Sequence, residues 1–192
     1  SNTTGYSNLA LGVNSLYSNT TGNYNLALGA YSLQSNTTGY SNSAVGYGSL
    51  YSNTTGVNNS ALGLNAGRAI TTGSSNTFLG YEAGYTGQNQ YAVNSMALGN
   101  GTYTTADNQV VIGNDSITQT LLKGNVGIGE AIPGSKLSVS GGATIGVNYD
   151  TTVAPSSGLL VEGNVGIGTT APAQKLDIEK GHIRLGQVAA PS

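Results

Sequence analysis

Carboxylates are the first groups to consider for catalysis, and this chain of 192 residues has only eight of them. Glycoside hydrolysis, for example, needs two Asp or Glu side chains that flank one bond. Four acids that follow the regular part of the chain are candidates for such a pair: Glu82, Asp107, Asp115 and Glu130. Their spacing gives no pair the separation that the reaction requires, so we interpret them as solvated turn residues. The sequence therefore predicts no catalytic residues and a protein that is not an enzyme.

Metal and cofactor ligands are equally sparse. His182 is the only histidine and cysteine is absent, so neither a Ser-His-Asp triad nor a His/Cys metal cluster has support. Asp107 and Asp115 each lie beside an asparagine, but the spacing of glycine and acids in a calcium loop is absent. The run Gly163–Gly168 lacks the GxGxxG spacing of a phosphate loop and the helix that would follow it. We expect no metal and no cofactor.

The twelve tyrosines are the most prominent candidates for binding. Exposed aromatic rings can stack on sugar rings, which makes four tyrosines in the first part of the chain candidate glycan contacts: Tyr17, Tyr24, Tyr31 and Tyr51. The alternative is that the rings pack between neighbouring repeats and between subunits, with their hydroxyls in water. We favour this packing role and keep a glycan as the alternative partner.

A 17-residue unit that opens with Ser-Asn-Thr-Thr-Gly occurs four times, from Ser1, Ser18, Ser35 and Ser52. A short fixed period is typical of a solenoid, in which each unit packs against its neighbours. Runs such as Asn8–Val13 are too short for a helix and predict strands. The Asn and Gly of each Ser-Asn-Thr-Thr-Gly predict turns. We expect each unit to form one coil of two short strands and two turns.

Alternating side chains give each predicted strand two faces. Small residues form one face, and we place them in the coil interior: Ala10, Ala27, Ala44, Ala61, Gly12, Gly29, Gly46 and Gly63. Larger apolar residues form the other face, which needs cover from outside the coil. Identical repeats put the same stripe on every copy of the chain, so closed symmetry hides it, and we predict a homotrimer. Its predicted contacts are Leu11, Leu28, Val45 and Leu62.

The repeat pattern changes along the chain and divides it into two regions. Regular coils at 1–68 are followed by irregular coils at 69–122, where the strand glycines Gly80, Gly99 and Gly113 are no longer evenly spaced. A second repeat begins near Lys123, because Gly124–Val139 matches Gly163–Ile178 position by position. Each copy predicts a strand, a Pro-containing turn and a strand. We therefore divide the chain into a β-roll repeat region, 1–122, and a two-copy repeat region, 123–192.

Two motifs resemble known families of fibrous proteins. The run Asn25-Leu26-Ala27-Leu28-Gly29 resembles the head repeats of trimeric autotransporter adhesins of the YadA-like type, which implies a trimer of left-handed parallel β-rolls. The run Asn164-Val-Gly-Ile-Gly168-Thr-Thr-Ala-Pro172 is similar to segments of phage tail fibres. The 17-residue period is longer than the usual adhesin head repeat. Together the resemblances imply an all-β homotrimeric fibre, outside the cell or on a virion.

Charge excludes other classes of partner. Charged residues make up 7% of the chain, the net charge is -2 and there is no basic run, so the footprint of a nucleic-acid or anionic-membrane binder is missing. No stretch approaches the roughly 18 apolar residues of a membrane span. The repeat begins at the first residue, and we interpret the chain as a processed piece whose anchor lies elsewhere.

The expected function is that of a structural shaft segment in a fibre that attaches to a host cell or surface, as in a phage tail fibre or a bacterial surface adhesin. The alternative is a carbohydrate-binding module that recognises a receptor through surface tyrosines. A polysaccharide-cleaving tailspike is the least favoured of the three.

Overall fold

The computed structural model describes residues 2–141, 143–145, 158–167 and 169–178. Within these ranges the regular structure is entirely β, with thirteen strands of three residues each and no helix. Contacts divide the chain into two units, Ser1–Thr120 and Leu121–Ser192. We describe each unit by itself.

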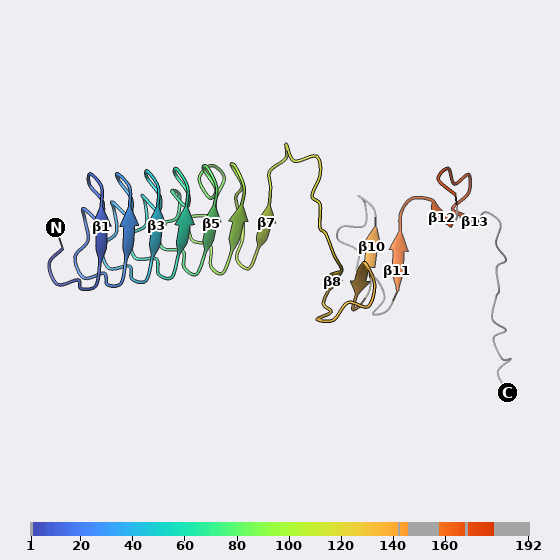
Figure 1. Cartoon of the computed structure of the whole chain (residues 1–192), viewed down its shortest axis with the longest axis horizontal. Coiled ribbons are helices and arrows are strands. Elements are labelled where there is room, and N and C mark those ends of the chain that lie inside the picture. Colours follow the sequence, from blue (N-terminus) through green and yellow to red (C-terminus); the bar gives the residue numbers. More distant parts are fainter. Residues whose placement is uncertain (1, 142, 146–157, 168, 179–192) are drawn as a thin grey trace, which may run out of the picture. The chain divides into compact units, whose positions relative to one another are not determined.

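The first unit is a parallel β-solenoid (Figure 1), which confirms the predicted all-β solenoid of stacked coils. Seven strands form one sheet in chain order, and every neighbouring pair is parallel. In the regular coils each residue pairs with its equivalent in the next repeat, as Ala10 does with Ala27. The strands are β1 (Leu9–Leu11), β2 (Leu26–Leu28), β3 (Ser43–Val45), β4 (Ser60–Leu62), β5 (Thr77–Leu79), β6 (Met96–Leu98) and β7 (Val110–Ile112).

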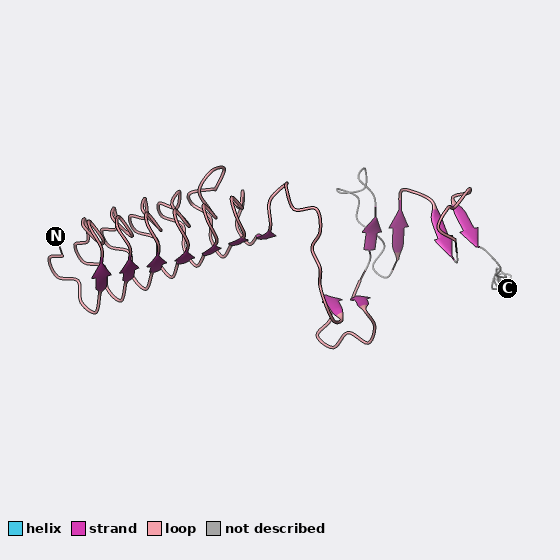
Figure 2. Ribbon diagram, turned by 45° about the horizontal axis from the view of Figure 1, so that its top comes forward, coloured by secondary structure: helices cyan, strands magenta, loops and turns pink. Residues whose placement is uncertain are grey.

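Each coil of this unit contains one strand, where the sequence predicted two. The strands lie side by side along one side of the solenoid, and turns form the rest of each coil (Figure 2). The backbone is left-handed at three places in the first coil, with φ of 54° at Ser7, 57° at Asn14 and 48° at Leu16. These bends recur in later coils and leave no extended run for a second strand. The turns still pair between coils, since Leu16 N donates to Ser32 O at 3.1 Å.

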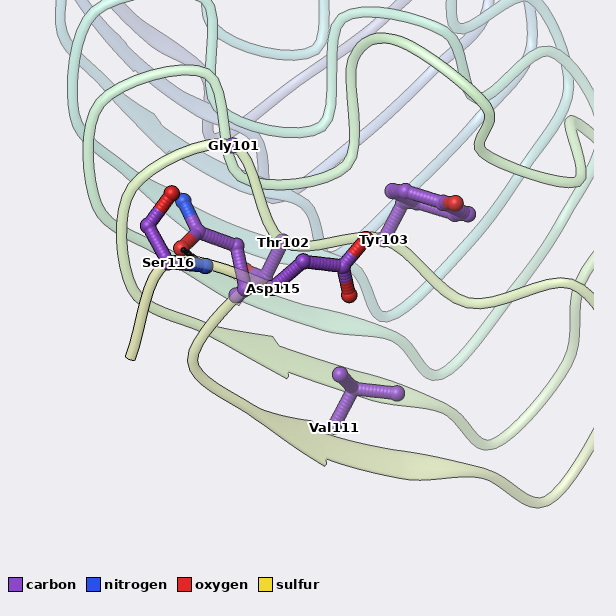
Figure 3. A pocket seen from close by; sticks show the side chains of 7 residues that line it. Gly101, Thr102, Tyr103, Val111, Asp115 and Ser116 are labelled. Atoms are coloured by element: carbon purple, nitrogen blue, oxygen red, sulfur yellow. Dashed lines mark hydrogen bonds between the residues drawn. The ribbon is translucent and has the colours of Figure 1, made fainter. Parts of the chain in front are cut away.

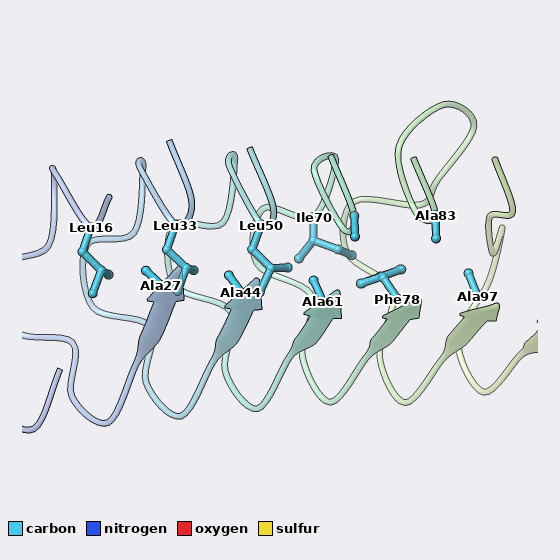
Figure 4. Close-up of a cluster of buried hydrophobic side chains, with 11 residues drawn as sticks. Leu16, Ala27, Leu33, Ala44, Leu50, Ala61, Ile70, Phe78, Ala83 and Ala97 are labelled. Carbon is cyan, nitrogen blue, oxygen red and sulfur yellow. The ribbon is translucent and has the colours of Figure 1, made fainter. Parts of the chain in front are cut away.

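Two columns of apolar side chains fill the interior of the solenoid (Figure 4). Ala27, Ala44 and Ala61 from the strands are buried, whereas Ala10, in the first coil of the stack, is exposed. The opposite wall is a leucine column that the sequence did not assign to the interior: Leu16, Leu33 and Leu50. Small residues on one wall and large ones on the other therefore set the narrow width of the coil.

In the irregular coils one aromatic ring takes the place of the alanine and leucine side chains that fill the regular coils. Phe78 of β5 occupies the alanine column and is buried, and Gly67 and Gly84 occupy the leucine column around it. A Cβ added to Gly67 would lie 2.7 Å from both Leu50 Cδ2 and Phe78 Cδ2, and one added to Gly84 would overlap the Phe78 ring. The ring therefore fills the volume that two leucine side chains would need.

Buried asparagines form two ladders that connect successive coils. In the first ladder, Asn36 Nδ2 donates to Asn19 Oδ1 at 2.8 Å and to Gly39 O at 3.0 Å, and Asn53 Nδ2 donates to Asn36 Oδ1 at 2.9 Å. The ladder ends where Ile70 takes the asparagine position, and Asn53 Oδ1 is buried there without a hydrogen bond. In the second ladder, the backbone N–H of each asparagine donates to the Oδ1 of the equivalent asparagine in the previous coil, at 2.9–3.0 Å. The members of this ladder are Asn8, Asn25, Asn42, Asn59 and Asn76.

The described residues of the second unit form three separate pairs of parallel strands. In the two repeat copies Asn125 Nδ2 donates to Pro133 O at 2.9 Å, and Asn164 Nδ2 donates to Pro172 O at 3.0 Å, so both close the loop between the strands in the same way. No residue that the structure describes in this unit is buried. The pairs are β8 (Val126–Ile128) with β9 (Leu137–Val139), β10 (Ala143–Ile145) with β11 (Leu159–Val161), and β12 (Val165–Ile167) with β13 (Leu176–Ile178).

Candidate functional site

The outward face of the solenoid sheet carries the four residues predicted to contact other subunits. Leu11 is 69% exposed and Leu62 is 52% exposed, and Leu28 and Val45 are half-buried between them. The same position continues into the irregular coils, so we define the outer column as Leu11, Leu28, Val45, Leu62, Leu79, Leu98 and Ile112. All seven side chains are aliphatic, and they form a continuous apolar stripe along the sheet.

The second outward position of each strand contains no charged residue either: Leu9, Leu26, Ser43, Ser60, Thr77, Met96 and Val110. A depression of about 210 Å³ lies in this face, with Val45, Leu62 and Leu79 among its lining residues. The outer face of a single chain is therefore uncharged, largely apolar and repeated at the interval of one coil.

The glycines predicted to lie in the coil interior with the alanines lie instead at the corner that follows each strand. Their φ angles are 142° at Gly12, 130° at Gly29, 133° at Gly46 and 137° at Gly63, a region that side chains disfavour. A Cβ added to Gly12 would lie 2.5 Å from the carbonyl of Gly29 in the next coil. These glycines are required for close stacking of coils and do not fill the core.

The four candidate glycan-binding tyrosines do not form one surface. Tyr17 and Tyr51 share a column, two repeats apart, while Tyr24 and Tyr31 occupy two other columns. Tyr17 is 62% exposed. Tyr24, Tyr31 and Tyr51 contact neighbouring side chains. The Tyr24 ring meets Tyr6 edge-on at 5.2 Å between centroids, Tyr31 meets Tyr47 at 5.4 Å, and the Arg68 guanidinium lies 4.3 Å from the Tyr51 centroid.

Neighbouring side chains also raise the pKa of two tyrosine phenols. Hydrogen bonding with the Tyr6 side chain raises the pKa of Tyr24 above its ordinary value. Hydrogen bonding with Glu82, together with the charge of that carboxylate, raises the pKa of Tyr81. Both tyrosines are therefore neutral at physiological pH.

A single cation lies between two aromatic side chains in this part of the solenoid. The guanidinium carbon of Arg68 lies 5.6 Å from the centroid of the Tyr85 ring. The Tyr51 ring packs on the same guanidinium group. Such cation–π contacts hold the rings in place. Tyr51 therefore packs against the Arg68 guanidinium.

Two of the acidic candidates accept hydrogen bonds from backbone amides. Asp107 Oδ1 accepts a hydrogen bond from Val93 N at 2.9 Å, and Glu130 Oε1 accepts one from Ile132 N at 3.0 Å. The described ranges contain no group of three or more His, Asp or Glu side chains that could hold a metal ion. Gly166 lies within strand β12, and His182 lies outside the described residues.

A hollow of the first unit lies beside its last strand, and it is a feature that sequence reasoning missed. It measures about 440 Å³ and is lined by Val111 and six further residues: Gly101, Thr102, Tyr103, Asn114, Asp115 and Ser116 (Figure 3). The one signal in the sequence was the shorter spacing between the strand glycines Gly99 and Gly113.

Comparison with family models, with curated proteins and with solved structures found no match to this chain. No helix in the described ranges is long and apolar enough to cross a membrane.

Proposed function

We propose that this chain is a structural shaft segment of a homotrimeric fibre that takes part in attachment to a host cell or surface. The observation that carries the proposal is the outer face of the solenoid sheet. Its outer column is aliphatic at seven consecutive strands and is exposed or half-exposed in a single chain. An apolar surface of this extent marks an interface in a soluble protein.

The repeat supports a second copy of the chain as the partner on this face. The face has no charge with which to select a partner by electrostatics, and its apolar groups recur once per coil. Another copy of the chain presents the same groups at the same interval, so every coil meets an equivalent coil. A threefold axis parallel to the stack keeps three copies parallel, and the resemblance to trimeric fibres favours this symmetry.

The second unit supports assembly independently. Its apolar side chains have no core to enter: Ile132 is 86% exposed, and Ile128, Leu137, Ile145 and Ile167 are also exposed. Two-stranded pairs with no buried residue have little stability of their own in water. Packing against equivalent segments of other copies would cover these side chains.

The mechanical role follows from the coil stack. Parallel backbone pairing, side-chain ladders and interior leucines connect each coil to the next along one axis. Such a quasi-one-dimensional structure provides reach and stiffness. We place the fibre outside the cell, on a phage tail or a bacterial surface, and assign it no catalytic activity.

The experiment that tests the assembly is a mass measurement by light scattering. The wild-type chain should have about three times its monomer mass of 19.3 kDa. Leu28→Asp should abolish the soluble trimer, because three buried carboxylates would meet at the axis without partners. Thr38→Asp places the same charge on an exposed turn residue of the next coil and should leave the trimer intact.

A monomeric wild-type chain, or a trimer that survives Leu28→Asp, would contradict the proposed interface. Electron microscopy of the parent particle separates the two proposed settings, because a tail fibre and a cell-surface filament have different attachments.

A further inference from the structure

The 440 Å³ hollow lies at the last coil, where the repeat departs from its regular period. Its volume is in the range of small-molecule sites. It is separate from the outer column, and it contains none of the four tyrosines discussed above. Its lining combines one aromatic ring, one carboxylate and several hydroxyl and amide groups.

Asn114 holds the loop that forms one wall of the hollow. Its Nδ2 donates to Asn100 O in the previous coil at 2.7 Å, and its Oδ1 accepts from Ser116 N at 3.0 Å. Its backbone oxygen accepts from Ile117 N at 2.9 Å. This Asx turn is a rigid local structure. It fixes the backbone at Asp115, whose carboxylate points toward Tyr103 (Figure 3).

Tyr103 forms the opposite wall and is supported from behind. Its ring packs on Gly87, where an added Cβ would lie 3.0–3.2 Å from ring atoms. The next residue, Thr104, is buried, and its backbone N–H donates to Gln88 Oε1 at 2.9 Å. Tyr103 as a whole is 44% exposed. One part of the ring is thus held by the protein and the rest is available to a ligand.

The charge and polarity of the lining residues exclude several classes of ligand. Asp115 makes no hydrogen bond or ion pair with the residues that the structure describes, and no lining residue is cationic. An anionic ligand would therefore be repelled. Calcium takes six to eight oxygen ligands, and the site has a single carboxylate. A purely apolar ligand would leave the carboxylate and the hydroxyls without partners.

We propose that this hollow is a binding site for a neutral sugar ring. The ring stacks on Tyr103, and vicinal hydroxyls donate to the Asp115 carboxylate, with the Ser116 hydroxyl as a further partner. The site goes beyond the shaft function, because it does not depend on the outer column or on the number of subunits.

The test uses the full chain with defined probes. Methyl glycosides of glucose, galactose, mannose and N-acetylglucosamine are screened by saturation-transfer NMR, and those that bind are titrated. Tyr103→Ala and Asp115→Ala should each weaken binding about tenfold or more, because stacking or a charge-assisted hydrogen bond is lost. Asp115→Asn keeps the shape of the side chain and should weaken binding through the loss of charge.

Two matched controls test whether these effects are local. Tyr91→Ala removes an exposed tyrosine that does not line the hollow, and Glu82→Gln removes a carboxylate of another coil. Both should bind like the wild type, and circular dichroism should show that all variants are folded. The proposal is overturned if the wild type binds none of the probes. It is equally overturned if binding survives both site variants, or if it requires added calcium and is lost with a chelator.

Discussion

The buried asparagines connect coils through side chains as well as through backbone. The side chain of Asn36 alone takes part in three hydrogen bonds, two as donor and one as acceptor, with partners in the coils on both sides and in its own turn. Because the site is fully buried, water cannot replace a lost partner. The ladder therefore fixes the alignment of neighbouring coils as well as adding stability.

Replacing Asn36 by alanine should lower the free energy of unfolding by about 2–4 kcal/mol. The substitution leaves Asn19 Oδ1 without its donor and Asn53 Nδ2 without one acceptor, and it removes one of the two donors to Gly39 O, the other being Asn25 Nδ2. Urea denaturation at a fixed protein concentration measures the change. Thr38→Ala, at an exposed position of the same turn, is the control and should change stability by less than about 0.5 kcal/mol. Equal effects of the two substitutions would mean that the ladder contributes nothing.

Single residues show how far sequence alone could go. The alanine column was placed inside from the alternation of side chains, and Ala27, Ala44 and Ala61 are buried. Leu16 was not placed, because its hydrophobicity equals that of the outward Leu11 and its φ of 48° is unusual for leucine. The asparagine ladders were visible as invariant columns, but turn propensity explained those columns equally well.

At the scale of the strand and its coil, Phe78 shows that the interior volume is conserved while the shapes change. The ring in β5 faces two glycines where regular coils have alanine facing leucine. Interior packing tolerates such an exchange when the total volume is kept.

Phe78→Ala should destabilise the protein by about 3–5 kcal/mol, since it leaves a cavity between Gly67 and Gly84. Gly67→Leu alone should cost about 1–3 kcal/mol, because the new side chain overlaps the ring. The double variant should be clearly more stable than the sum of the two effects implies, since the leucine fills the cavity. Thermal or urea denaturation of all four proteins completes the cycle. Additive effects would show that the ring and the glycines are independent.

The coil itself was only partly predictable. One strand per coil was recognised from its apolar run and flanking turn residues, but the expected second strand is absent from the described coils because left-handed residues interrupt it. The 440 Å³ hollow depends on how the loop at Asn114 folds back toward Gly101, and the shorter spacing between Gly99 and Gly113 marks an irregular coil without encoding that approach. The second region was recognised from its repeat, and the bonds from Asn125 to Pro133 and Asn164 to Pro172 give the repeat its physical basis.

At the scale of the whole molecule, the solenoid is modular. Deleting residues 27–43 removes one complete repeat, so Leu26 joins Ala44 and every later strand keeps its inward and outward faces. The shortened chain should fold, with a lower melting temperature because one set of coil contacts is lost. Circular dichroism and thermal melting measure both properties.

Deleting residues 28–43 is the matched control, because it leaves one extra residue inside a strand. Side chains alternate along a strand, so this deletion turns apolar groups to the wrong face. We expect a much larger loss of stability than with the deletion of a complete repeat. Equal stability of the two deletions would show that the period does not set the alignment of the coils.

The first asparagine ladder also gives the stack a direction. The Nδ2 groups of Asn19, Asn36 and Asn53 each donate to the Oδ1 of the asparagine in the preceding coil, so the amides of this row point the same way. The amide dipoles therefore add along the axis, as peptide dipoles do in a helix. One end of the row presents partial positive charge and the other partial negative charge. In a parallel trimer the three rows would point the same way, so the shaft would carry opposite partial charges at its two ends. This polarity would arise without ionised side chains, because the sequence has no charged side chain before Arg68.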